Sequence, residues 1–395
     1  MMAGDTMVTI SLAGSLFFSV TPTEAKGKVL AYLLLTIAPF AVVSPLLGPL
    51  IDRSSNGRRY IVAFSALSRV VLCYLMSRSL KSVLLYPEAF LVLISSKLYV
   101  VTRGALVPEM ARADWSNSAL DSAGWPAHDQ AGEKGFAGFN AQLTLLGTVV
   151  GIFGGFIGVG ILKSIGAPSV LITASILFLV ATVAGLRLRR GVPRERTPET
   201  PLNPVEEDLQ ALRPHGDVEV SWGLVATAVV RFAVGFETFL LAFVLRRENA
   251  SVGLFAAALV LSALGALAGL AIVTRVRNRL AESTMLTIAL IGVGVGTLLA
   301  ASFASNYAQV ALSAWLGAAA AIAQPSFDAI TQRNVPESAQ GRTFARFAVR
   351  QQLLWVIGAT IPVAIAMSFA TGDLAVAVLT LSAGVAYGFG RRFAR

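Results

Sequence analysis

Cysteine, histidine and charged residues are all scarce in this sequence. Its 395 residues contain one cysteine, Cys73, and two histidines, His128 and His215, which lie in polar stretches far apart in the chain. A single cysteine excludes an internal disulfide, and the cysteine and histidine patterns of a metal site are absent. Charged residues make up 14% of the chain, against roughly 25% in soluble proteins. This composition excludes a single soluble domain, a disordered chain and a secreted disulfide scaffold.

The sequence also lacks the usual signatures of enzymes and nucleotide-driven machines. No G-x-x-x-x-G-K-[ST] loop occurs, so the chain does not hydrolyse nucleotide by that route. The run Gly292, Gly294 and Gly296 lies inside an apolar stretch rather than between a strand and a helix, so it is not a dinucleotide fingerprint. With no histidine, cysteine or paired-carboxylate constellation either, we expect no enzymatic activity, no cofactor and no metal.

Twelve long apolar stretches are what the sequence has in abundance. A membrane helix needs about 20 mostly apolar residues, and a polar linker separates two sets of six such stretches. They lie near residues 4–20, 29–51, 60–77, 84–104, 139–162, 168–187, 222–245, 252–273, 284–304, 307–329, 344–369 and 374–390. We therefore predict an all-α integral membrane protein with an N-terminal six-helix bundle over 1–187, a cytoplasmic linker over 188–221 and a C-terminal six-helix bundle over 222–395.

Two segments depart from this regular pattern. The first apolar stretch has only about 17 compatible residues and includes Asp5, so we expect a truncated first helix whose true start lies upstream. The segment 105–138 has five acidic residues and is rich in Ser, Ala and Gly. This composition predicts a largely disordered cytoplasmic insert in the N-terminal bundle.

The basic residues sort by side of the membrane. If the N-terminus is cytoplasmic, 21 Lys and Arg residues fall in inside segments and 7 in outside segments. An excess of basic residues on one side marks the cytoplasmic face. We therefore predict a multi-pass protein of the plasma (inner) membrane with both termini in the cytoplasm. The net charge of +10 is then a topology signal, and no nucleic-acid partner is expected.

An internal repeat links the two halves. The tripeptide Val-Pro-Glu ends the fourth apolar stretch of each half, at 107–109 and again at 335–337. The second stretch of each half also ends in a glycine followed by basic residues, from Gly48 and from Gly269. These similarities indicate that six helices were duplicated as a block in the same orientation, which is typical of carriers with a site between their halves.

The segment after the second stretch resembles the major facilitator superfamily, and the resemblance extends over essentially the whole chain. That family has the pattern G-x-x-x-D-R-x-G-R-R, which Gly48, Asp52, Arg53, Gly57, Arg58 and Arg59 match with two extra residues before Gly57. The resemblance implies twelve helices in two pseudo-symmetric bundles and transport by alternating access. It also implies that Gly48, Asp52, Arg53, Arg58 and Arg59 form a conformational latch on the cytoplasmic side.

The fifth stretch carries a second, weaker match. Small residues at a four-residue or three-residue spacing let two helices approach closely, and one helix face here has that spacing. The residues of this packing motif are Gly147, Gly151, Gly154, Gly155 and Gly158. Proton-driven exporters of the family carry G-x-x-x-G-P-x-x-G-G in this helix, and the chain has Ile152 for the proline and Phe156 for the last glycine. Simple helix packing remains the alternative explanation.

Ionisable residues inside the apolar stretches are the candidate site residues, because such groups are costly in a membrane. Glu237 and Asp5 are the candidates for proton coupling. Arg231, Arg69 and Lys97 are candidates for a substrate contact or a counter-charge. Glu237 and Arg231 lie about 240° apart on one helix, so we do not expect them to pair. A structural ion pair with another helix is the alternative role for Glu237.

The function that these observations favour is proton-coupled export of a small amphipathic compound. The opening Gly4-Asp5 and the loop 331–342 resemble the macrolide and siderophore exporters of the family, which implies a drug-like or macrolide-like substrate. The expected partners are that small molecule, protons and membrane lipids, and the expected state is a monomer. Two alternatives stay open, an uptake permease or lipid or siderophore carrier on the same fold, and a non-transporting membrane sensor or assembly protein.

Overall fold

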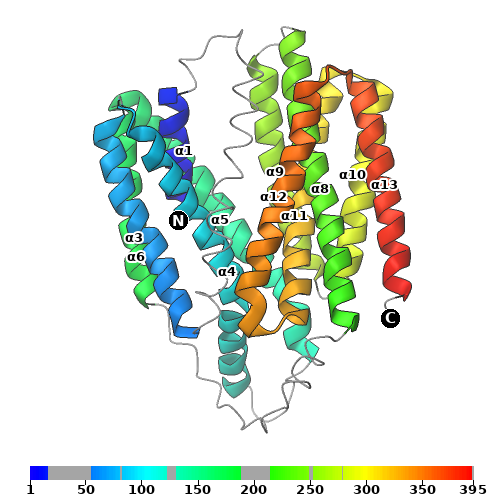
Figure 1. Cartoon of the computed structure of the whole chain (residues 1–395), viewed down its shortest axis with the longest axis horizontal. Coiled ribbons are helices and arrows are strands. Elements are labelled where there is room, and N and C mark those ends of the chain that lie inside the picture. The colour runs from blue at the N-terminus through cyan, green and yellow to red at the C-terminus, as the bar shows by residue number, and fades with distance from the viewer. Residues whose placement is uncertain are drawn as a thin grey trace. The chain divides into compact units, whose positions relative to one another are not determined.

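The described part of the chain is built from α-helices (Figure 1). This computed structural model describes residues 1–16, 55–80, 82–121, 130–187, 214–248, 252–277 and 279–393. It divides the chain into two compact units. The first unit comprises Met1–Val107, Gln142–Arg189 and Glu337–Val349, and the second comprises Pro108–Ala141, Arg190–Pro336 and Arg350–Arg395.

The first unit is built mainly from the helices of the N-terminal half. Its helices are α1 (Met2–Leu16), α3 (Ser55–Ser79), α4 (Leu85–Asp121, as far as residue 107), α5 (Gln130–Ser164, from residue 142) and α6 (Ala167–Arg187). Helix α6 packs against both α1 and α3, and its fully buried Phe178 lies in the core with Met76 and Cys73. The first residues of α12 join this unit through Phe344, which packs with Ile61 and Val101.

The second unit is built mainly from the helices of the C-terminal half. Its helices are α8 (Pro214–Arg247), α9 (Val252–Val276), α10 (Glu282–Phe303), α11 (Asn306–Asn334), α12 (Glu337–Ala364, from residue 350) and α13 (Phe369–Phe393). Helix α11 packs against α8, α9 and α10, while α13 packs against α8 and α10. Helices α8, α11 and α13 thus form a connected group, and this group carries the polar cluster described below.

Small residues set how closely α9 and α11 approach each other. A Cβ atom at Gly265 would overlap the backbone of Ala314, and one at Gly317 would overlap the backbone of Ser262. The alanine-rich and glycine-rich sequence of both helices therefore serves their contact, in the way that small residues act between membrane helices. Tight turns complete the connections, as at Gly166, whose φ of 109° lets α6 begin three residues after α5 ends.

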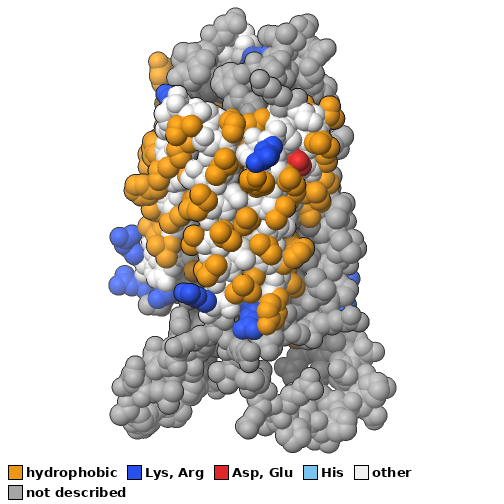
Figure 2. All heavy atoms as spheres, turned by 90° about the vertical axis from the view of Figure 1, so that its left-hand side faces the viewer, with side chains coloured by type: hydrophobic (Ala, Val, Ile, Leu, Met, Phe, Trp, Pro, Cys, Tyr) orange, Lys and Arg blue, Asp and Glu red, His pale blue; other side chains and the backbone are white. Residues whose placement is uncertain are grey.

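Ten of the described helices are long and apolar enough to cross a membrane. Their surfaces agree with that assignment, because large hydrophobic side chains such as Phe64, Phe156 and Phe303 are exposed. Figure 2 shows one face that is covered largely by hydrophobic side chains, with few charged ones among them. The predicted all-α integral membrane fold is confirmed. The predicted second span, 29–51, lies outside the described residues, and the first, 4–20, is described as far as residue 16, within α1.

Two sequence predictions need correction. The segment 105–138 is not largely disordered in its described part, because α4 continues to Asp121 and α5 begins at Gln130. Alanine, leucine, methionine and glutamate in 105–121 favour helix, and this preference outweighs the polar composition. The predicted linker 188–221 is too long at its end, since α8 begins at Pro214, a residue type that suits the first turn of a helix. Residues 188–213 lie outside the described part.

Candidate functional site

Three helices of the second unit bring a buried polar cluster together. Glu237 of α8, Gln309 of α11 and Asp373 of α13 are 3%, 2% and 0% exposed. The side-chain amide nitrogen of Gln309 donates a hydrogen bond to Oδ2 of Asp373, and the carboxyl groups of Glu237 and Asp373 interact with each other. We call Glu237 and Asp373 the carboxyl pair.

The carboxyl pair is poorly supplied with hydrogen-bond donors. Both carboxyl oxygens of Glu237, and Oδ1 of Asp373, are buried, and no N–H or hydroxyl group of the described residues donates to them. Buried polar atoms in proteins nearly always have partners, so these oxygens depend on the facing carboxyl group, with which Glu237 and Asp373 interact. An ionised carboxylate is an acceptor only, whereas a protonated carboxyl group is also a donor. The pair can therefore accept a hydrogen bond from a further donor group, or one of its two carboxyl groups can itself carry a proton.

A glycine allows the two helices of the pair to meet. Gly372 precedes Asp373 on α13, and a Cβ atom there would overlap the side chain of Leu240 and lie 3.1 Å from Cε1 of Phe236 on α8. Phe236 and Leu240 lie on either side of Glu237 along that helix. The close approach of α13 at Gly372 therefore places Asp373 beside Glu237.

A second polar group occupies α8 and α11 at another level. Arg231 donates from Nη2 to the side-chain oxygen of Gln324 at 3.2 Å, and the amide nitrogen of Gln324 donates to Oδ1 of Asp328 at 2.8 Å. The Arg231 guanidinium also interacts electrostatically with Asp328. Arg231 and Glu237 are thus engaged separately, as their angular separation on the helix predicts.

A third polar group joins the ends of three helices in the second unit. Arg333 of α11 forms ion pairs with Glu219 of α8 at 2.9 Å and with Glu282 of α10 at 3.2 Å. Glu282 is 8% exposed at its side chain, whereas Glu219 and Arg333 are about a third exposed. This triad ties the beginnings of α8 and α10 to the end of α11.

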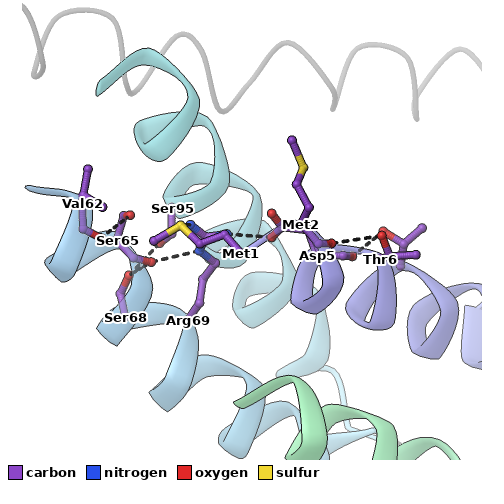
Figure 3. A network of polar contacts seen from close by, with 10 residues as sticks. Met1, Met2, Asp5, Thr6, Val62, Ser65, Ser68, Arg69 and Ser95 are labelled. Carbon is purple, nitrogen blue, oxygen red and sulfur yellow. Dashed lines mark hydrogen bonds and ion pairs between the residues drawn. The ribbon is translucent and has the colours of Figure 1, made fainter. Parts of the chain in front are cut away.

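The first unit contains a buried ion pair. Arg69 of α3 is completely buried, and its Nη1 lies 2.7 Å from Oδ1 of Asp5 on α1. Figure 3 shows the two side chains pointing toward each other from their helices. The Nε of Arg69 donates to the backbone oxygen of Ser65 at 2.9 Å, and its guanidinium carbon lies 4.7 Å from the centre of the Phe178 ring. Asp5 keeps a side-chain exposure of 25%.

This pair joins two residues that the sequence analysis treated separately. Arg69 was a candidate for a substrate contact or a counter-charge, and its partner Asp5 lies 64 residues away in the chain. Asp5 and Arg69, which were singled out for different roles, therefore act on each other. Lys97, the other cationic candidate of this half, is partly buried on α4, and its predicted substrate role stays a prediction.

The predicted latch falls mostly outside the described residues. Gly48, Asp52 and Arg53 lie there, and Arg58 is described only as part of α3. Arg59 donates to the hydroxyl of Tyr60 at 2.6 Å, and its guanidinium carbon lies 4.6 Å from the centre of that ring. The latch stays a prediction.

The glycines of α5 face α1. A Cβ atom at Gly154 would lie 2.7 Å from Cα of Ala3, and one at Gly151 would lie 3.3 Å from the Thr6 hydroxyl. The other glycines of the motif approach side chains of α1 in the same way, namely Gly147, Gly155 and Gly158. The motif therefore serves close packing of α1 on α5, and its further role in proton-driven export stays a prediction.

Sequence reasoning missed Asp373 and Gln309. The last apolar stretch was placed at 374–390, so Asp373 fell one residue outside it, whereas α13 begins at Phe369. Gln309 lies in the apolar stretch 307–329, and a glutamine there gave no signal of its own. The available signal was an acidic residue close to the beginning of a long apolar stretch. That signal is ambiguous, because an acid in a solvated loop and a buried acid look alike in the sequence.

The cluster offers no obvious metal chemistry. Within the described residues, no group of three or more His, Cys, Asp and Glu side chains is placed to hold a metal ion. The cluster's titratable groups are two carboxyl groups, and it lies inside helices that are long enough to span a bilayer. These features define the class of the protein as a multi-pass membrane carrier with ionisable groups among its helices.

Comparison with known proteins agrees with this class. The profile of the Major Facilitator Superfamily matches residues 132–359, which is more than half of the chain. The chain therefore belongs to this superfamily, whose members are transporters rather than enzymes.

Curated relatives are mycobacterial proteins described as uncharacterised. One from Mycobacterium leprae is 29% identical over 96% of this chain and 67% of its own length. One from Mycobacterium tuberculosis is 32% identical over 49% of this chain and 32% of its own length. The chain thus spans about two thirds of the first relative and about one third of the second.

Solved structures share the fold at low sequence identity. A bacterial homologue of the iron transporter ferroportin, in an outward-facing state, has a TM-score of 0.67 at 14% identity, over 100% of this chain and 96% of that one. The human organic anion transporter MFSD10 has 0.64 at 14% identity, over 99% and 90%. The Escherichia coli fucose:proton symporter FucP has 0.62 at 13% identity, over 100% and 95%.

Proposed function

We propose that this transporter exports a small amphipathic compound, of the drug or macrolide type, in exchange for protons by alternating access. The observation that carries the proposal is Glu237, a buried carboxyl group in a membrane-spanning helix, to which no N–H or hydroxyl group of the described residues donates a hydrogen bond. Ionisable groups inside a membrane are rare and costly, and they commonly mark proton and substrate paths. A structural ion pair, the alternative role for Glu237, has no cation to support it among the described residues, because no Lys, Arg or His nitrogen there lies within 4 Å of this carboxyl group.

Protons supply enough energy for this function. One proton that moves down a potential of about 100 mV releases roughly 2.3 kcal/mol. Because a tenfold concentration ratio corresponds to about 1.36 kcal/mol, one proton sustains a substrate gradient of roughly fifty-fold. A nucleotide is therefore not required as a source of energy.

The position of the carboxyl pair suits a proton that enters from outside. Asp373 lies four residues after the first residue of α13, and Gln309 lies three residues after the first residue of α11. At 1.5 Å per residue these positions are about 5–6 Å from the helix ends. If both termini are cytoplasmic in the plasma membrane, as the distribution of Lys and Arg predicts, those helix ends face the outside, where the proton-motive force supplies protons.

The fold is compatible with proton coupling. FucP, which shares it, is a fucose:proton symporter. That protein moves its sugar and its proton in the same direction, so the fold alone does not set the direction of export or uptake. The direction must be measured.

Accumulation of fluorescent dyes and of a macrolide in efflux-deficient bacteria tests the proposal. Cells that express the chain should accumulate several-fold less compound than cells that express no transporter, and an uncoupler should abolish the difference. Glu237→Gln should abolish it as well, because glutamine cannot release a proton. The matched control is Glu219→Gln on the same helix, where the carboxylate is ion-paired at 2.9 Å to Arg333 rather than orphaned.

Each outcome of this test has a definite meaning. Export that survives the uncoupler would contradict proton coupling. Increased accumulation would select the uptake permease, and equal accumulation by a well-expressed, membrane-inserted protein would favour a non-transporting role over export of these compounds. Loss of export in both variants would mean that the effect is not specific to Glu237, and would contradict its role in proton coupling.

A further inference from the structure

The carboxyl pair is unequal in its surroundings. Asp373 accepts a hydrogen bond from the Gln309 amide at Oδ2, whereas neither oxygen of Glu237 accepts any. A hydrogen bond from an N–H group favours the ionised form of the carboxylate that accepts it. A carboxyl group without donors has no such support for its charge. The two members of the pair are therefore suited to different protonation states.

A proton on Glu237 would satisfy the atoms that are left over. A protonated Glu237 carries one O–H donor, and its neighbour Asp373 has an unpartnered, buried Oδ1 to accept it. Two ionised carboxylates side by side repel each other, and such pairs hold one proton between them. A single proton thus removes the repulsion and pairs Oδ1 of Asp373.

No other charge in the described surroundings takes the place of that proton. From α11 the neutral Gln309 faces the pair, and from α8 itself Phe236 and Leu240 pack beside it against Gly372. Helix α12 approaches α8 nearby through the backbone of Trp355 and Ala359, against Gly235. Arg231 is engaged with Gln324 on another side of α8. Within the described residues, no Lys, Arg or His nitrogen lies within 4 Å of either carboxyl group.

A bound metal cation fits these surroundings less well than a proton. Hard cations such as Ca²⁺ or Mg²⁺ take six or more oxygen ligands. The pair offers three unpartnered oxygens, and Gln309 presents its N–H group to the pair rather than its oxygen.

We propose that the carboxyl pair holds one proton, which resides on Glu237 and is donated to Oδ1 of Asp373, while Gln309 keeps Asp373 ionised. This inference rests on the proposed function and names the chemistry of its coupling site. Glu237 is the proton carrier, Asp373 is its acceptor and Gln309 is a positioning residue. When the proton leaves, two adjacent carboxylates remain in a buried place. Their repulsion pushes α13 and α8 apart at Gly372 or admits water, so that release of the proton is linked to a change in helix packing.

Infrared difference spectroscopy on the purified full-length chain tests this assignment. Spectra recorded between mildly acidic and mildly alkaline pH report the C=O stretch of a buried protonated carboxyl group, and exchange into D₂O shifts that band. The wild type should show one such band from the pair. Glu237→Gln should remove it, and Asp373→Asn should keep it at a shifted frequency, because the acceptor changes from a carboxylate to an amide. Glu219→Gln should leave it unchanged.

Gln309→Leu separates positioning from mere packing. Without the Gln309 donor the two carboxyl groups become more alike, so the band should broaden or split as the proton is shared between Glu237 and Asp373. A protein in which Gln309 only fills space would keep the wild-type band. This variant, together with Asp373→Asn, keeps the assignment testable if Glu237→Gln fails to fold.

Several results would overturn the proposal. These are the absence of any protonated carboxyl band in the wild type, a band that is lost in Asp373→Asn but kept in Glu237→Gln, or a band that Na⁺ abolishes at constant pH. The measurement needs no transported compound, so it is independent of the transport assay. Uncoupler-sensitive export without the band would overturn this assignment alone. The band together with uncoupler-insensitive export would overturn the proposed function alone.

Discussion

Ionisable side chains in the described helices differ in how their charges are balanced. Arg69 has a carboxylate at 2.7 Å, a backbone carbonyl and an aromatic ring around its guanidinium. Arg333 has two glutamates. Glu237 has only another carboxyl group as its charged neighbour among the described residues. A balanced charge is stable as it stands, whereas an unbalanced one gains from a ligand, and this difference supports the proposal that Glu237 is a functional residue.

The Asp5–Arg69 pair leads to a prediction about stability. Asp5→Asn removes the counter-charge of Arg69, whose side chain is fully buried. Breaking a buried pair from one side costs about 3–5 kcal/mol, and the partial exposure of Asp5 reduces this cost. We expect the free energy of unfolding to fall by about 1–3 kcal/mol, measured by denaturant unfolding of the purified protein in detergent micelles.

The double variant Asp5→Asn/Arg69→Met is the matched control for that prediction. Methionine has a similar length and carries no charge, so the double variant removes the stranded cation. It should be more stable than Asp5→Asn alone. Additive losses from the two substitutions would mean that the charges do not act as a pair.

The triad of Arg333, Glu219 and Glu282 predicts unequal losses of stability for two substitutions. Arg333→Met strands the carboxylate of Glu282, which is 8% exposed, and should lower the unfolding free energy by about 1–3 kcal/mol. Glu219→Gln should cost less than about 1 kcal/mol, because exposed ion pairs contribute little and Arg333 keeps Glu282. Thermal unfolding midpoints of the two variants check this order. Equal losses would argue against burial as the cause.

At this scale, the sequence allowed some residues to be predicted and not others. Glu237 was singled out because one acidic residue stands in a long apolar stretch, and its role stays a prediction. The partner of Arg69 was out of reach, since no local pattern relates positions 5 and 69. Asp373 and Gln309 join Glu237 only through the packing of three helices, so the cluster depends on tertiary structure that a single sequence does not display.

Helices, the next scale, owe their contacts to small residues. The α5 glycines that contact α1 predict a contrast between two identical substitutions on one helix. A Cβ atom at Gly154 would lie 2.7 Å from the backbone of Ala3, whereas one at Gly160 would have no atom within 4 Å. Overpacking costs about 1–3 kcal/mol, and alanine favours helix over glycine by about 1 kcal/mol. Gly154→Ala should therefore destabilise the protein, and Gly160→Ala should be neutral or slightly stabilising.

Unfolding and transport measured on the same two variants separate packing from a role in export. A loss of stability in Gly154→Ala that is matched by an equal loss of export would show that the motif acts through packing. Loss of export with unchanged stability would point to a role of this contact in transport beyond packing. A destabilised Gly160→Ala would contradict the geometric argument.

Helix positions were predictable from hydropathy, and helix ends were less so. The apolar stretch 168–187 closely matches α6, which spans Ala167–Arg187. By contrast, α4 continues for 17 residues beyond the predicted stretch 84–104, and α8 begins eight residues before the predicted stretch 222–245. Hydropathy reports where a helix crosses the membrane, but a helix continues into polar sequence for as long as its residues favour helical backbone.

At the scale of the whole molecule, the orientation in the membrane decides which side of the bilayer each helix end faces. The carboxyl pair, whose Asp373 lies near the beginning of α13, can use the proton-motive force only if that end has access to the side rich in protons. The positions of Lys and Arg predict that this side is reached from the α10–α11 turn, and that the α9–α10 connection faces the cytoplasm. Membrane orientation is thus a condition for the proposed function rather than a separate property.

Cysteine labelling on intact cells checks this orientation. The natural Cys73 is fully buried, so it should react little with a membrane-impermeant maleimide. Tyr307→Cys, at a position that is 79% exposed beside the α10–α11 turn, should be labelled from outside. Arg279→Cys, at an exposed position between α9 and α10, should be labelled only after permeabilisation. The reverse pattern would place the carboxyl pair near the cytoplasm. Protons from outside would then have to travel along most of α8 to bind it, which would argue against the proposed route.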